Sequence, residues 1–133
     1  MQYRRAIGIN VVLYLATLVI TVAILALRGD PLQFSTPPNT HQITWAMMIG
    51  TILTTAGAWW YFRTQPGSAR AGLWFGVIAI LVGLAMDMVV SVGIWMSGKN
   101  PFDFLTASYS LPFFGVMLGS VLVLTTVVGA RKR

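Results

Sequence analysis

Four long apolar runs occupy most of this 133-residue chain, covering residues 6–27, 43–62, 71–96 and 111–128. An α-helix rises 1.5 Å per residue and a bilayer's hydrocarbon core is about 30 Å thick, so about 20 apolar residues suffice to cross it. The pattern predicts an all-α integral membrane protein with a single domain, residues 1–133, built as a four-helix transmembrane bundle.

The composition argues against two other classes of chain. Hydrophobic residues make up 56% and charged residues 9%, whereas a soluble domain carries charge on about a quarter of its residues. Disorder requires low hydrophobicity and high charge, the opposite of this chain. The sequence also contains no cysteine, which excludes disulfides, thiol redox chemistry and cysteine metal sites.

The first apolar run could instead belong to a secretory signal peptide, because Arg4 and Arg5 precede it. The run is about twice as long as the apolar region of such a signal, and no small-residue cleavage site follows it. We therefore interpret residues 6–27 as a retained first helix.

Lysine and arginine placement predicts the orientation, since cytoplasmic loops of membrane proteins are enriched in both. Two basic residues, Arg28 and Lys99, fall on one side of the predicted membrane. The other side holds seven: Arg4, Arg5, Arg63, Arg70, Arg131, Lys132 and Arg133. The prediction is a multi-pass protein of the cytoplasmic (inner) membrane with both termini inside.

The net charge of +6 could suggest a nucleic-acid partner. The charges instead flank the apolar runs, where they orient a membrane protein, and no basic stripe lies on a soluble face. The expected partners are therefore the lipid bilayer and either other membrane subunits or further copies of this chain, with no nucleic acid.

The two predicted outer loops resemble each other. Residues 30–36 align with residues 100–106 at an offset of 70, with Asp30-Pro31 matching Asn100-Pro101. One explanation is an internal duplication that produces two helical hairpins in the same orientation. The other is chance recurrence of proline, phenylalanine and threonine in two interfacial loops.

Asp87 is the residue with the clearest chemical potential, because it lies near the middle of the third apolar run. An ionised carboxylate at the bilayer centre costs about 2.5–3.5 kcal/mol on insertion scales, so such an acid pairs with a donor or stays protonated. Asp87 could couple transport to a proton or cation. Alternatively, it holds helices together by hydrogen bonding.

Small residues share a helical stripe with Asp87 and predict close helix packing. This expected packing set comprises Gly72, Gly76, Gly83 and Ser91, with Gly115 and Gly119 in the fourth run. The first run supplies a polar stripe, Asn10, Tyr14, Thr17 and Thr21, that could face Asp87. The candidate hydrogen-bond donors to Asp87 are Thr17, Thr21 and Thr54, unless these threonines bond carbonyls of their own helices.

No constellation in the sequence predicts catalysis, a metal site or a cofactor. His41 is the only histidine and has no neighbouring ligand residues, and no nucleophile or phosphate-binding motif occurs. The chain is therefore expected not to be an enzyme. It fits an accessory, assembly or regulatory subunit of a membrane complex, or alternatively a homo-oligomeric proton-coupled transporter of small solutes that uses Asp87.

Overall fold

The computed structural model describes residues 2–29, 40–90 and 112–131, and the regular secondary structure of this part of the chain is all α-helix. Its helices are α1 (Tyr3–Arg28), α2 (Thr40–Thr64), α3 (Ala69–Val90) and α5 (Pro112–Arg131). The predicted all-α bundle of four helices is confirmed, and each helix overlaps one of the four apolar runs. Residues 91–96 of the third run and both loops of the proposed repeat lie outside the described residues.

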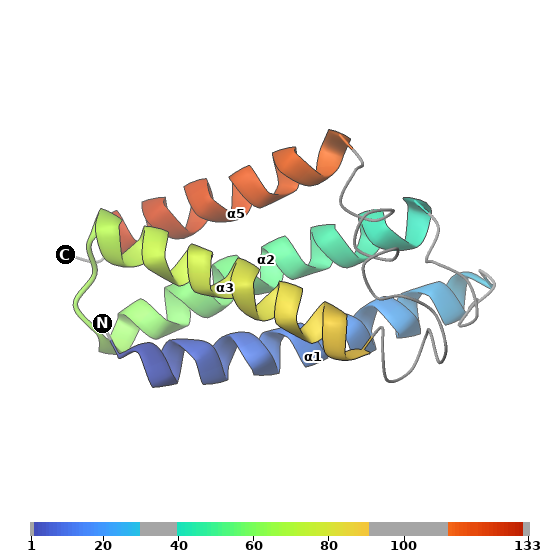
Figure 1. The fold of residues 1–133 in the computed structure, drawn as a ribbon, viewed down its shortest axis with the longest axis horizontal. Helices are drawn as coiled ribbons and strands as arrows, with labels where there is room; N and C mark the ends of the chain where they lie inside the picture. Colours follow the sequence, from blue (N-terminus) through green and yellow to red (C-terminus); the bar gives the residue numbers. More distant parts are fainter. Residues whose placement is uncertain (1, 30–39, 91–111, 132–133) are drawn as a thin grey trace.

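The helices form an up-and-down bundle in which α1 and α3 run in one direction and α2 and α5 run in the other (Figure 1). α1 packs against α2 and α3, and α5 packs against the same two helices. α2 and α3 scarcely touch, so they lie across a diagonal. Both chain termini and the α2–α3 connection lie at one end of the bundle, here called the terminal end.

Local signals define where the helices begin and end. α1 ends at Gly29, whose φ of 72° is the left-handed conformation that glycine adopts without a steric cost. α3 begins after Ser68, whose Oγ accepts a hydrogen bond of 3.0 Å from the Ala71 amide. Pro112 occupies the first position of α5, where its missing amide hydrogen costs no helical bond.

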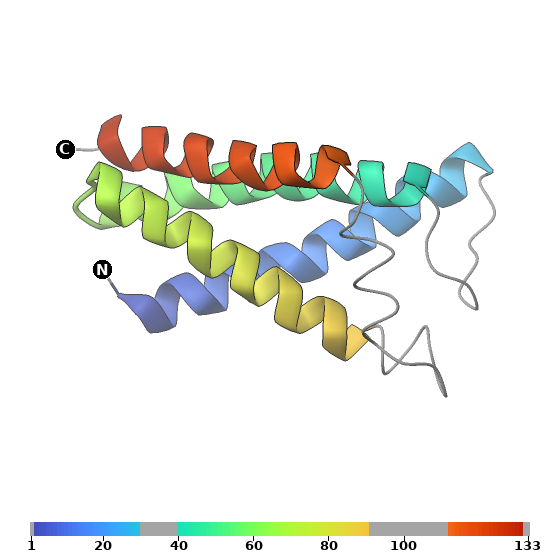
Figure 2. The same cartoon turned by 45° about the horizontal axis from the view of Figure 1, so that its top comes forward.

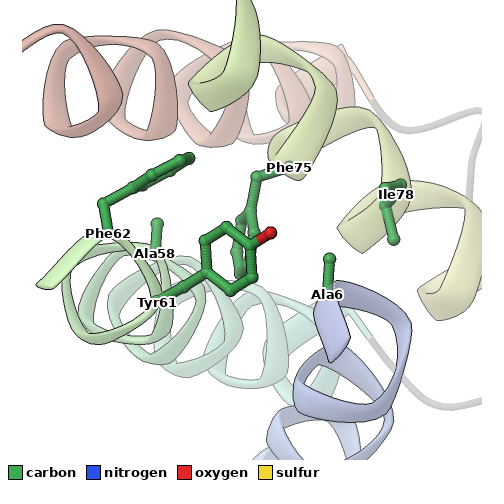
Figure 3. Close-up of a cluster of buried hydrophobic side chains, with 6 residues drawn as sticks. All are labelled: Ala6, Ala58, Tyr61, Phe62, Phe75 and Ile78. Carbon is green, nitrogen blue, oxygen red and sulfur yellow. The ribbon is translucent and has the colours of Figure 1, made fainter. Parts of the chain in front are cut away.

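An aromatic cluster joins α1, α2 and α3 near the terminal end (Figure 3). Tyr61 and Phe75 are fully buried, and their ring centroids lie 5.3 Å apart. Phe62 packs edge-on against Tyr61 at 5.0 Å, within the range of favourable aromatic pairs. The Tyr61 hydroxyl also accepts a hydrogen bond of 2.9 Å from the Gln2 amide, which attaches the start of α1 to this cluster.

Glycines bring α3 and α5 into backbone contact at the same end. A Cβ on Gly72 would overlap the carbonyl oxygen of Thr125, and one on Gly129 would lie 2.7 Å from the Cα of Gly72. Only hydrogen fits at these positions, so the two helix axes approach closely. Towards the opposite end α3 and α5 separate (Figures 1 and 2).

Two helices, α1 and α3, are long and apolar enough to cross a membrane, and α5 carries a shorter apolar stretch over Gly115–Arg131. Only 17% of the apolar stretch of α1 and 22% of that of α3 is buried in the bundle. A core helix of a soluble protein would be mostly covered. Instead, large apolar side chains such as Val19, Leu81 and Val123 are exposed on three different helices.

Candidate functional site

Asp87 lies on α3 beside α1, where it is half-buried. The Tyr14 hydroxyl, also half-buried, donates a hydrogen bond of 2.5 Å to Asp87 Oδ1. The pair joins two helices that run side by side in the same direction, and those are the two helices of the described chain that are long and apolar enough to cross a membrane. The acid is therefore partnered within the bundle.

A phenol is a suitable partner for an acid in apolar surroundings. It donates one O–H and carries no charge, so it stabilises a carboxylate without adding a second ion to be desolvated. The arrangement can do two things chemically: it can fix the crossing of α1 and α3, and it can hold a proton or release one at Oδ1.

The three predicted donors occupy other positions. Thr17 donates a hydrogen bond of 2.8 Å to the carbonyl of Leu13 in its own helix, as the alternative for these threonines predicts. Thr54 lies on α2, which scarcely contacts α3 and so is poorly placed to reach Asp87. Thr21 is buried, and its hydroxyl has no hydrogen-bond partner within the described residues.

One member of the polar stripe of α1, Tyr14, contacts the acid, whereas Thr17 lies against Gly50 of α2. Asn10 is 4% exposed and donates to the carbonyl of Ala6, at the level of the aromatic cluster. Tyr14 is one turn further along and reaches across to α3. Its membership of the stripe is visible in the sequence, and side-chain length was the signal that would have favoured it over the threonines.

The expected packing glycines fall into two groups. Gly72 and Gly76 contact α5 closely, and a Cβ on Gly76 would lie 2.5 Å from Thr125 Oγ1. In contrast, a Cβ on Gly83, Gly115 or Gly119 would meet no described atom within 4 Å. The physical reason is the separation of α3 from α5 beyond their glycine contact. Ser91 lies outside the described residues.

Gly129 is a packing residue that the sequence pattern did not single out. It faces Ser68 and Gly72, and a Cβ there would lie 2.6 Å from the Ser68 carbonyl oxygen. It lies ten residues after Gly119, and no glycine or alanine stands between them to continue the three- or four-residue repeat used to find packing stripes. Only the location of the α2–α3 connection over the last turn of α5 explains why a glycine is needed.

No protein-family model, curated protein or solved structure matches this chain.

Metal binding receives no support from the described part of the chain, where no three histidine, cysteine, aspartate or glutamate side chains lie together. The interpretation of the site thus depends on the pairing of Asp87 with Tyr14 and on the two groups of glycines.

Proposed function

We propose that this protein spans the cytoplasmic membrane four times, with both termini inside, and serves as an accessory or assembly subunit of a membrane complex. The observation that carries the proposal is the open glycines of α3 and α5. A Cβ added at Gly83, Gly115 or Gly119 would meet no described atom of another element within 4 Å, while other glycines of the same two helices are in backbone contact. Small residues are the positions at which membrane helices approach one another, so these three suit a helix of a partner subunit.

The membrane placement is supported by the side chains that the bundle leaves outside. The apolar stretches of α1 and α3 are mostly uncovered, which suits a lipid environment. Six of the described hydroxyl groups are satisfied within their own helices, as lipid requires. The hydroxyls that bond a carbonyl one turn earlier belong to Thr17, Thr51, Thr55, Ser120, Thr125 and Thr126.

Arginine–tryptophan pairs at two levels of the α1–α2 hairpin fit membrane–water interfaces. Arg28 lies 5.3 Å from the ring centroid of Trp45, and Arg63 lies 4.6 Å from that of Trp59. From Trp45 to Arg63, α2 rises about 27 Å at 1.5 Å per residue, close to the thickness of a hydrocarbon core. Tryptophan and arginine both favour the interfacial region, so the hairpin suits a transmembrane setting.

A second candidate, a homo-oligomeric proton-coupled transporter, is favoured by the half-buried acid. Asp87 is accessible in part and is bonded to a neutral phenol, so its carboxylate could exchange a proton with a passing solute. A bundle of four helices has little room for a pathway of its own. This candidate therefore requires two or more copies of the chain around the site.

Gentle extraction from native membranes, native-gel sizing and mass spectrometry test the accessory role. We expect stoichiometric co-migration with other membrane subunits. The variant Gly119→Leu should release these subunits, because the leucine side chain would occupy the open space beside Gly119 that a partner helix is proposed to use. A homogeneous species that contains two or more copies of this chain alone would instead favour the transporter.

Gly8→Leu provides the matched control. Gly8 lies on α1, and a Cβ there also meets no described atom within 4 Å. The substitution adds the same bulk at a helical glycine away from the face of α3 and α5. If Gly8→Leu and Gly119→Leu release partners equally, the α3–α5 face is not the contact surface.

A further inference from the structure

The terminal end of the bundle concentrates positive charge from all four helices. Arg4 and Arg5 begin α1, Arg63 ends α2, Arg70 begins α3 and Arg131 ends α5. All except the half-buried Arg5 are exposed. The helix ends that carry these arginines lie at the terminal end of the bundle (Figure 1). Arginines up to 127 positions apart in the sequence therefore lie at one end of the molecule, and these five are here called the arginine face.

Among the described residues, no acidic side chain lies at the terminal end to offset this charge. The chain contains three acids in total, Asp30, Asp87 and Asp103, and only Asp87 is described. Asp87 lies between α1 and α3, where it accepts a hydrogen bond from Tyr14. The first turns of α1 and α3 also lack the acidic residues that usually compensate the positive ends of helices.

Tryptophans orient part of the arginine face. The guanidinium of Arg63 lies 4.6 Å from the Trp59 ring centroid, and that of Arg5 lies 5.7 Å from the Trp60 centroid. A guanidinium stacked on a ring keeps its N–H edge available, and that planar edge matches two oxygens of a phosphate. Trp59, Trp60 and Trp74 are themselves 46%, 52% and 45% exposed, as suits indole rings at the level of lipid headgroups.

From this geometry we propose that the arginine face binds the phosphate headgroups of anionic phospholipids in preference to zwitterionic ones. The inference rests on the membrane placement proposed above and adds the class of lipid that it needs. A zwitterionic headgroup brings one positive group for each phosphate. An anionic headgroup brings a net negative charge, and this charge compensates the positive charge of the five guanidinium groups.

The test uses the full chain in lipid nanodiscs of equimolar phosphatidylcholine and phosphatidylglycerol. Native mass spectrometry then measures the ratio of the two lipids retained by the released protein. We expect phosphatidylglycerol to be enriched about threefold. The double variant Arg5→Gln, Arg63→Gln should reduce the ratio towards one. Equal retention of the two lipids by the wild-type chain would overturn the proposal.

Arg28→Gln is the matched control, because Arg28 also stacks on a tryptophan, Trp45, but at the opposite end of the hairpin. It should leave the enrichment unchanged, and an equal loss in this variant would show that the arginine face has no special part. A wild-type titration from 0.15 to about 1 M salt needs no variant, and the enrichment should fall as charges are screened.

Two further outcomes separate this inference from the proposed function. Failure of the chain to enter nanodiscs would overturn both the membrane placement and the lipid preference. Normal insertion with no lipid preference would overturn only the latter. Binding of an added RNA oligonucleotide at 0.15 M salt, lost in the same double variant, would assign the arginine face to nucleic acid.

Discussion

Tyr14 and Asp87 lie 73 positions apart in the chain and are joined by a hydrogen bond of 2.5 Å between α1 and α3. The bond connects Asp87, the only acid of the described residues, to α1. The two threonine hydroxyls of the α1 stripe make no such bond: Thr17 donates to its own helix, and Thr21 has no hydrogen-bond partner within the described residues. Asp87 is therefore held by an interaction between helices, and its role can be tested from either partner.

Removing the donor should weaken the bundle modestly. Tyr14→Phe keeps the ring but leaves Asp87 without this hydroxyl, and polar contacts between membrane helices contribute about 1 kcal/mol. We expect the free energy of unfolding to fall by about that amount in a reversible denaturation experiment in mixed micelles. Tyr3→Phe is the control, because Tyr3 is 57% exposed on the same helix. Equal effects of the two variants would mean that the Tyr14 bond contributes nothing to stability.

Substitutions at Asp87 distinguish a structural role from a coupling role. Asp87→Asn keeps a carbonyl oxygen that can accept from Tyr14, whereas Asp87→Leu removes the acceptor. If the acid only joins helices, we expect Asn to be nearly silent and Leu to weaken assembly on a native gel. If the acid couples transport, Asn should abolish proton flux in proteoliposomes while the protein still inserts and assembles.

Alanine should be costly at one glycine of α3 and almost without effect at another. A Cβ on Gly72 would overlap the Thr125 carbonyl oxygen and lie 2.9 Å from the Cα of Thr126, both backbone atoms that cannot rotate away. Gly72→Ala should therefore destabilise the bundle by about 2 kcal/mol or more, as overpacking does. Gly83→Ala meets open space and should change stability by less than about 0.5 kcal/mol. The same denaturation experiment measures both variants, and similar losses would contradict the close α3–α5 contact.

The hydroxyl of Tyr61 should protect the start of α1. Tyr61→Phe preserves the buried ring beside Phe75 but removes the acceptor of the Gln2 amide. We expect faster hydrogen exchange at the first turn of α1, with little change at the far end of that helix. Uniform acceleration along α1 would indicate loss of the whole aromatic cluster instead.

Topology reporters test the membrane orientation. Alkaline phosphatase is active only when exported, so a fusion after Arg133 should be inactive. A fusion within residues 30–39 should be active. An active fusion after Arg133 would overturn the proposal that the C-terminus is cytoplasmic, whatever the role of Asp87.

The sequence alone was enough to predict four helices and their approximate bounds, because long apolar runs separated by proline, glycine and charged residues leave few alternatives to a helix. It also identified Asp87 as unusual, since an acid in the middle of a long apolar run is visible without knowledge of the fold. The polar stripe containing Tyr14 was visible for the same reason, as helical spacing is a local property.

Only the tertiary structure decided which members of each stripe meet. The contact of Asp87 with Tyr14 depends on α1 lying beside α3, and periodicity within one helix carries no information about its neighbour. Likewise, Gly72 and Gly83 share a stripe of α3. A Cβ on Gly72 would overlap the α5 backbone, whereas a Cβ on Gly83 would meet no described atom within 4 Å, because α3 and α5 diverge. Helix formation is specified by the residues of each segment, whereas the partners of a helix are chosen by packing among segments far apart in the chain.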